Sequence, residues 1–295
     1  MITSASISQH IASSVKPYFE LLKLRLSLLV TFSSAFGYML AHQGMIDWER
    51  FIGFCIGGFL ITGSSVTINQ IIEKKHDALM SRTLKRPLPT ERLSNRAAIY
   101  YSIFLAIAGS IVLLQFTNPL TWIISLISLV LYAFVYTPLK RVGPIAVFVG
   151  AFPGALPPLI GWAAATGVIG YEALIIFGIQ FIWQFPHFWA IAWVADEDYK
   201  RAGFKLLPGG GQKDLNTAIN IMIYTLFLLP LGLLPTYFGV TGITSGVIAT
   251  LCGVLFLSQT FMLMKDYSKK SALKIMFSSF VYLPIVQIAY LVDKI

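Results

Sequence analysis

Long apolar runs alternate with short polar segments along this chain. Each apolar run is about twenty residues long, which is the length a helix needs to cross the hydrocarbon core of a bilayer. Taken in order, they predict nine spans, near residues 21–41, 51–72, 97–115, 119–137, 143–165, 172–194, 217–238, 243–264 and 272–292. We therefore predict an all-α polytopic membrane protein. Residues 1–295 would form one membrane-embedded domain, with nine transmembrane helices around a central cavity that opens to the cytoplasmic side.

The composition supports a membrane protein over a soluble one. Of the 295 residues, 56% are hydrophobic and only 12% are charged, whereas roughly a quarter are charged in an ordinary soluble domain. Mean hydropathy is +0.74. The net charge of +9 could indicate nucleic-acid binding, but the basic residues border the apolar runs. We therefore interpret the charge as a sign of membrane orientation and expect no nucleic-acid partner.

The distribution of basic residues tests the number of spans. With nine spans, 20 of the 22 Lys and Arg residues fall on one side of the membrane, and only Arg50 and Lys294 fall on the other. Cytoplasmic loops carry such an excess of Lys and Arg. The pattern predicts a cytoplasmic N-terminus, a C-terminus on the opposite side and an active face on the cytoplasmic side.

The strongest candidate site ends the second span, where Asn69, Glu73 and Asp77 follow one another at intervals of four residues. On a helix each step of four advances about 40°, so the three side chains share one face over roughly 12 Å. Mg²⁺ is commonly held by carboxylates together with substrate phosphates and water. The spacing therefore suits a magnesium diphosphate. The alternative is an ordinary solvated helix end, with Lys74 and Lys75 as counter-charges.

Basic residues follow this motif directly. Arg82 and Arg86 precede the prolines Pro87 and Pro89, and their guanidinium groups could bind phosphate oxygens by charge-assisted hydrogen bonds. The alternative for each is plain positive-inside charge. Their position next to the acidic face favours the phosphate role.

Two further polar patches lie at other cytoplasmic boundaries. Asp196, Glu197 and Asp198 are three consecutive acids in an otherwise basic loop, and together with the first motif they could clamp a diphosphate through metal ions. At the end of the fourth span stand a phenol and two cations, Tyr136, Lys140 and Arg141. An interfacial aromatic with flanking charged anchors is the alternative there.

These motifs resemble the UbiA-type superfamily of intramembrane prenyltransferases and, within it, the protoheme IX farnesyltransferases. Asn69-x3-Glu73-x3-Asp77 is similar to the superfamily's first aspartate-rich motif, with Glu in the middle place where Asp is usual. Tyr136-x3-Lys140 is similar to its YxxxK motif. The narrower resemblance rests on longer strings: DALMSRTLKRPL from Asp77, GALPPLIGW from Gly154, PHFWA from Pro186, and Asp198-Tyr199-x2-Ala-Gly. The DxxxD sequence that is usual for the superfamily's second motif is absent. The haem-type enzymes share a simpler Asp-Tyr form there, and Asp198 is the residue that matches it.

The resemblance implies a function and a set of ligands. The family transfers a farnesyl group from farnesyl diphosphate to a vinyl group of haem B, which is substrate and not cofactor, and so forms haem O. It implies Mg²⁺ held by Asn69, Glu73, Asp77 and Asp198, with the diphosphate bound by Arg82, Arg86, Tyr136, Lys140 and Arg141. Membrane lipid and a downstream haem A synthase are the partners that it implies, and the bacterial inner membrane is the location.

Two residues of the sixth span are candidates for acceptor binding. His187 lies in an aromatic-rich stretch with Trp189, and an ionisable residue inside a membrane is by default a functional hypothesis. A neutral imidazole could ligate the haem iron or orient the porphyrin. An interhelical hydrogen bond is the alternative.

Two other functions remain open on the sequence. A related prenyltransferase could act on a quinone precursor or another lipophilic acceptor, although the PHFWA and Asp198-Tyr199 strings argue against this. A polytopic secondary transporter could also have nine spans. It would place broken helices near the bilayer midplane, and Gly154 to Pro158 could interrupt the fifth span in this way.

Overall fold

The computed structural model describes residues 15–295. Within that range nine helical segments are long and apolar enough to cross a membrane, which confirms the predicted number of spans. They are α2 (Leu24–Ala41), α3 (Trp48–Asp77), α4 (Asn95–Phe116), the segment Pro119–Leu139, α7 (Ile145–Thr166), α8 (Tyr171–Val194), α11 (Leu215–Tyr237), α12 (Ile243–Asp266) and α13 (Lys269–Val292).

The fourth span is not a uniform helix. It comprises α5 (Pro119–Val130), the π-helical segment η1 (Leu131–Tyr136) and α6 (Thr137–Leu139). The Thr137 hydroxyl donates to the Tyr132 carbonyl five residues earlier, at 2.8 Å. Such wide turns are often found at functional sites, and this one carries Tyr136.

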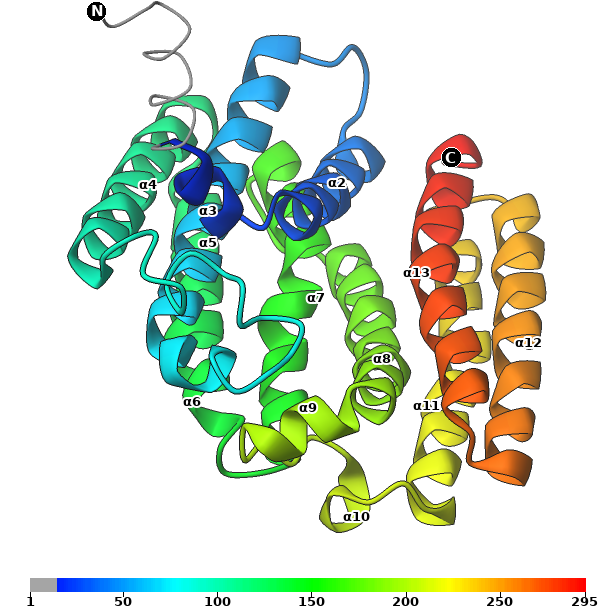
Figure 1. The fold of residues 1–295 in the computed structure, drawn as a ribbon. Helices are drawn as coiled ribbons and strands as arrows, with labels where there is room; N and C mark the ends of the chain where they lie inside the picture. The colour runs from blue at the N-terminus through cyan, green and yellow to red at the C-terminus, as the bar shows by residue number, and fades with distance from the viewer. Residues whose placement is uncertain (1–14) are drawn as a thin grey trace, which may run out of the picture.

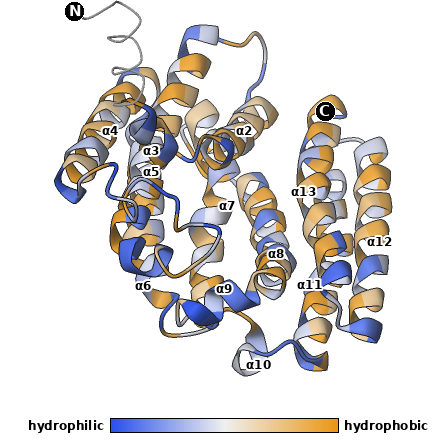
Figure 2. Cartoon of the chain, viewed as in Figure 1, coloured by the Kyte–Doolittle hydropathy of each residue, from blue (hydrophilic) through white to orange (hydrophobic). Residues whose placement is uncertain are grey.

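Polar side chains define where several spans begin. At five of them the residue before the first turn accepts a hydrogen bond from a backbone N–H three residues later, which satisfies one of the free donors of the helix. These caps are Asp47, Ser94, Asn118, Asp214 and Ser268. Figure 2 shows the hydrophilic residues gathered in the loops and at the helix ends, and the helices themselves largely hydrophobic.

The helices form three neighbouring groups. Figure 1 shows α3, α4 and α5 at one edge, α11, α12 and α13 at the other, and α7 and α8 between them. Helix α2 contacts α3, α7 and α13. Two short helices, α9 (Asp196–Arg201) and α10 (Pro208–Gly211), follow α8 at the same end of the bundle as α6.

Helices α2 and α7 pack backbone against backbone. A Cβ atom at Gly161 would lie 1.9 Å from the Ser34 carbonyl oxygen, and one at Gly37 would lie 1.9 Å from the Pro158 carbonyl oxygen. Only glycine permits such an approach, so these two residues fix the distance between the first and fifth spans.

A buried cluster of polar side chains ties α2, α8 and α13 together. The Ser33 hydroxyl donates to Gln180 Oε1 at 2.9 Å, and Gln287 Nε2 donates to both residues at 3.0 Å. The cavity beside the cluster is only about 10 Å³, which barely admits one water molecule. These hydrogen bonds therefore join helices and leave no room for a ligand.

Helix α7 runs unbroken from Ile145 to Thr166, although it contains Pro153, Pro157 and Pro158. Pro158 has no N–H to offer the carbonyl of Gly154, four residues earlier. Gln180 and Gln184 of α8 donate to that carbonyl instead, at 2.8 and 2.9 Å. The expected interruption at Gly154 to Pro158 is therefore wrong, because the neighbouring helix satisfies the freed backbone group.

Candidate functional site

The predicted face at the end of α3 is present and buried. Asn69, Glu73 and Asp77 are 1%, 4% and 0% exposed. They occupy the last three turns of α3, which extends beyond the predicted span to Asp77. Three polar groups are therefore enclosed by protein at the membrane edge.

Each of these side chains has one cationic partner from a different segment. The pairs are Lys23 Nζ with Asn69 Oδ1 at 2.9 Å, Lys140 Nζ with Glu73 Oε1 at 2.8 Å, and Arg86 Nη1 with Asp77 Oδ2 at 2.7 Å. Three cations thus face two carboxylates and one amide. The local excess of positive charge suits an anion that binds between them.

Lys23 is the least compensated of the three cations. Its partner is an amide oxygen, which carries no formal charge. Burial, together with the nearby Arg86 charge, lowers the pKa of Lys23 from its ordinary value to about 7. Lys140 differs, because Tyr136 and Glu73 raise its pKa above the ordinary value although burial opposes this.

The phenol of the fourth span lies against this cationic group. Lys140 Nζ stands 4.6 Å from the ring centroid of Tyr136. On α7, Gly150 leaves room for the ring, since a Cβ there would lie 2.6 Å from it. The rings of Tyr136 and Phe188 are 6.5 Å apart, so the YxxxK motif reaches α8. Asn69 also joins this span, donating to the Thr137 hydroxyl at 3.0 Å.

Two predicted diphosphate ligands stand apart from the buried face. Arg141 donates to the backbone carbonyl of Ile72 at 3.3 Å and so caps the side of α3. Arg82 lies over the ring of Tyr199 at 4.9 Å and is exposed. Of the basic residues predicted as ligands, Arg86 and Lys140 are the ones whose side chains pair with the carboxylates of α3.

The second acidic patch does not join the first. Asp198 contacts Ser81 and Arg201, and Asp196 pairs with Lys200 at 2.9 Å and Lys213 at 3.3 Å. Within residues 15–295 no three His, Cys, Asp or Glu side chains converge closely enough to hold a metal ion. The expected clamp of Asp198 with Glu73 and Asp77 is therefore not assembled by protein groups alone.

His187 and Trp189 do not share a face of α8. His187 Nδ1 lies 2.8 Å from the Ser279 hydroxyl of α13, and its ring stacks on Trp183 at 4.4 Å. Trp189 packs instead against Tyr224 of α11, at 5.1 Å. Two positions apart on a helix are separated by about 200°, so the two side chains face different helices, and the acceptor role of each stays a prediction.

The sequence interpretation missed three residues of this site. Lys23 counts only among the basic residues of the cytoplasmic side, although its place near the start of the first apolar run, residues 21–41, is a signal. Ser81 lies within the DALMSRTLKRPL string, but neither it nor Ser279 is singled out by its spacing, since the partner of each is about a hundred residues away, Asp198 and His187.

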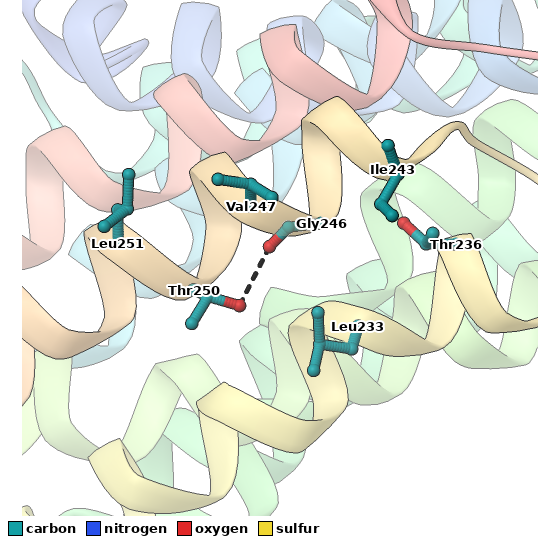
Figure 3. Close-up of a pocket in the computed structure, with 7 residues that line it drawn as sticks. All are labelled: Leu233, Thr236, Ile243, Gly246, Val247, Thr250 and Leu251. Carbon is teal, nitrogen blue, oxygen red and sulfur yellow. Dashed lines mark hydrogen bonds between the residues drawn. The ribbon is translucent and has the colours of Figure 1, made fainter.

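A pocket elsewhere in the molecule has no such chemistry. It is a groove of about 210 Å³ between α11 and α12, lined by Leu233, Thr236, Ile243, Gly246, Val247, Thr250 and Leu251. Figure 3 shows the Thr250 hydroxyl donating to the Gly246 carbonyl one turn earlier in α12, on one wall of this groove. Without a charged side chain in its lining, it cannot hold a diphosphate.

Known proteins resemble this chain in sequence and in fold. The model of the UbiA prenyltransferase family matches residues 29–282. The protoheme IX farnesyltransferase of Cytophaga hutchinsonii is 56% identical over 284 residues, which cover 96% of this chain and 99% of that protein. The protoheme IX farnesyltransferase of Christiangramia forsetii is 44% identical over 288 residues, covering 96% and 95%.

Solved structures share the fold at low sequence identity. A structure of digeranylgeranylglyceryl phosphate synthase has a TM-score of 0.79 and 21% identity, covering 95% of this chain and 98% of that one. A UbiA homologue from Archaeoglobus fulgidus bound to GPP and Mg²⁺ has a TM-score of 0.66 and 16% identity, covering 93% and 99%. The predicted resemblance is confirmed: this chain belongs to the UbiA prenyltransferase family, among relatives named protoheme IX farnesyltransferase.

Proposed function

We propose that this protein transfers a farnesyl group from farnesyl diphosphate to a vinyl group of haem B, which gives haem O. The single observation that carries the proposal is the buried face of α3, where Asn69, Glu73 and Asp77 meet Lys23, Lys140 and Arg86. A site with carboxylates and excess cations fits a metal-bound diphosphate. The high identity to farnesyltransferases that act on protoheme IX supports haem B as acceptor.

The residues present fit a divalent cation. Asp77 Oδ1 is buried and has no hydrogen-bond partner among the described residues, while Oδ2 is paired with Arg86. A buried carboxylate oxygen without a partner is costly unless something binds it. Asp77, Glu73 and the amide of Asn69 would hold Mg²⁺, which neutralises charge that develops on the leaving diphosphate.

The reaction begins with loss of the diphosphate. The allylic C–O bond breaks, and both electrons leave with the diphosphate. Lys23, Lys140 and Arg86 would receive that anion from fixed positions, which stabilises the charge where it develops. Arg82 would add a further cation from the exposed side.

The farnesyl cation then needs surroundings that do not react with it. The faces of Tyr136 and Phe188 lie next to the diphosphate ligands, and aromatic faces attract cations. The electron pair of the haem vinyl group forms the new C–C bond. Water adds to the resulting cation on the acceptor and loses a proton, which leaves a hydroxyethylfarnesyl substituent.

His187 would position the acceptor. Its Nδ1 is engaged by Ser279, so Nε2 is the nitrogen that can face a haem iron or a porphyrin edge. The rings of Trp183, Phe188 and Phe280 surround it, with centroids 4.4, 5.4 and 4.9 Å away. They provide the flat apolar contacts that a porphyrin requires.

The orientation and the partners follow from the same proposal. We place the diphosphate site on the cytoplasmic side of a bacterial inner membrane, with the N-terminus on that side and the C-terminus opposite. The product is consumed by a reaction that oxidises haem O, so a haem A synthase is the expected downstream partner. Lipid covers the exposed apolar faces of the outer helices.

Incubation of the purified protein with haem B, farnesyl diphosphate and Mg²⁺ tests the proposal. The expected product is haem B with one farnesyl group and one hydroxyl group added, identified by mass. Chelation of Mg²⁺ by EDTA should abolish its formation, and readdition should restore it. Transfer to a quinone precursor, with none to haem B, would overturn the acceptor assignment but leave the prenyltransferase in place.

A further inference from the structure

Both carboxylate oxygens of Asp198 are already occupied by hydrogen-bond donors. Oδ1 accepts from the Ser81 backbone N–H at 3.2 Å and from the Ser81 hydroxyl at 2.8 Å. Oδ2 accepts from the Arg82 backbone N–H at 3.4 Å and lies 3.0 Å from the same hydroxyl, whose single hydrogen the two oxygens share. Arg201 forms an ion pair with Oδ1. These contacts lower the pKa of Asp198 below its ordinary value although burial alone would raise it.

A second set of contacts joins the same two loops. The Arg82 guanidinium lies over the Tyr199 ring at 4.9 Å. The rings of Tyr199 and Phe204 are 6.2 Å apart, and Phe204 stacks on His76 at 5.2 Å with 14° between the planes. Residues 198–204 thus rest on residues 76–82, about 117 positions earlier in the chain.

The turn held by Asp198 leads directly into the diphosphate ligands. The Thr83 hydroxyl donates to the Asp77 carbonyl at 2.8 Å, and the Arg86 guanidinium pairs with the Asp77 carboxylate. The Ser81–Arg82 turn is therefore held by Asp198 through its backbone N–H groups. The residues that follow the turn are held by Asp77. Movement of this turn would move both arginines relative to the buried face.

We infer that Asp198 and Ser81 form a latch that positions Arg82 and Arg86 for the diphosphate, and that Asp198 is not a metal ligand. The inference rests on the proposed function for its substrate. A carboxylate that accepts two backbone N–H groups and a hydroxyl, with a guanidinium alongside, has little remaining capacity for a metal ion. Asp198 is thus a positioning residue that acts through the backbone of the neighbouring loop.

The test compares Asp198→Asn, Ser81→Ala and the double variant with the wild type. If the latch positions the arginines, each single change should raise KM for farnesyl diphosphate by roughly tenfold, the loss typical of hydrogen bonds to a charged group. The Mg²⁺ concentration for half-maximal activity should stay within twofold of the wild type. The double variant should be little worse than Asp198→Asn, because the Ser81 hydroxyl acts only through its hydrogen bond to the Asp198 carboxylate.

Asp196→Asn is the matched control, because Asp196 is equally buried but pairs with Lys200 and Lys213 and not with the latch. It should leave both constants unchanged. A tenfold or greater rise in the Mg²⁺ requirement of Asp198→Asn, with normal KM at saturating Mg²⁺, would overturn the inference in favour of a metal ligand. If Asp198→Asn does not fold, Ser81→Ala alone must show the rise in KM.

A second measurement does not depend on turnover. In metal-free protein, amide hydrogen exchange in residues 79–86 should accelerate in Asp198→Asn and Ser81→Ala, and not in Asp196→Asn. Unchanged exchange there would contradict the latch even if activity fell. If the wild type fails to farnesylate haem B, the proposed function fails, while the exchange result still decides whether the latch exists.

Discussion

Lys23 connects the pH of the solution to the charge of the site. Its pKa of about 7 means that the buried amine is protonated below this pH and neutral above it. Binding of farnesyl diphosphate should therefore weaken as the pH rises from 6 to 8.5, because a donor loses its charge. Lys23→Met should weaken binding by roughly tenfold or more at pH 6, and a labelled-ligand binding curve at each pH measures both effects.

Lys23→Arg is the control for this prediction. A guanidinium stays charged at every pH used, so this variant should bind over the whole range with only the dependence due to the ligand's own ionisation. A decline as steep as that of the wild type would exclude Lys23 as the titrating group.

We expect different effects on haem affinity from substitutions at His187 and Trp189, although the two residues are only two positions apart. His187→Ala should lose haem affinity yet retain farnesyl diphosphate binding, because the diphosphate ligands lie on α3, the loop after it and the fourth span. Trp189→Phe should keep both, since Trp189 packs on α11. Soret titrations with haem B, beside a labelled-diphosphate curve, make the comparison. Equal haem affinity in the wild type and His187→Ala would remove His187 from the acceptor site.

Residue spacing predicted the polar face of α3 but not the cations that contact it. Asn69, Glu73 and Asp77 share a helix, so their common face follows from a period of four. Their cations come from three separate segments, and a sequence gives no distance between such segments. Asp198 was recognisable as a motif residue, but its partner Ser81 depends on how two loops meet, and no local pattern encodes that contact.

Helix α7 shows that glycines in one bundle differ in what they permit. Gly161→Ala would place a Cβ 1.9 Å from the Ser34 carbonyl oxygen, so α2 and α7 must separate. The expected loss of stability is about 1–3 kcal/mol or more, seen as a lower midpoint of thermal unfolding in detergent.

Gly178→Ala in α8 is the counterpart, because nothing beyond its own turn of helix, in the part of the chain that the structure describes, lies within 4 Å of a Cβ there. It should be neutral or stabilising by up to about 1 kcal/mol, the difference in helix propensity. A similar loss of stability in both variants would mean that the close contact between α2 and α7 does not decide the outcome.

The elements themselves were predicted unevenly. Their number and approximate limits followed from the apolar runs, because bilayer thickness imposes one length on every span. The π-helical turn at Leu131–Tyr136 was not predicted. An apolar run has the same residue pattern in an α-helix and in a π-helix, so the sequence does not distinguish them. The continuity of α7 depends on Gln180 and Gln184 of α8. The prolines within α7 give no indication of these contacts, so the unbroken helix could not be predicted.

The orientation of the protein across the membrane follows from the partition of its charges. A reporter fused at residue 90 or 205, in loops rich in Lys and Arg, should be cytoplasmic. Fusions at residues 118, 168 and 240 should report from the far side. A far-side signal at 205 would contradict the proposed orientation of α8 and α11, and with it the cytoplasmic diphosphate site.

The buried cluster of polar side chains that joins α2, α8 and α13 also limits when the bundle can be completed during synthesis. Ser33 of α2 finds its partner Gln287 of α13 across 254 residues of chain. At about 5–20 residues per second, the ribosome needs roughly 13–50 s to make that stretch. During this interval the first span is already in the lipid, while its hydrogen bond to Gln287 of α13 cannot yet form. Assembly of the bundle must therefore finish late. Until α13 has been synthesised, Ser33 and Gln180 lie in the bilayer without their hydrogen bonds to Gln287.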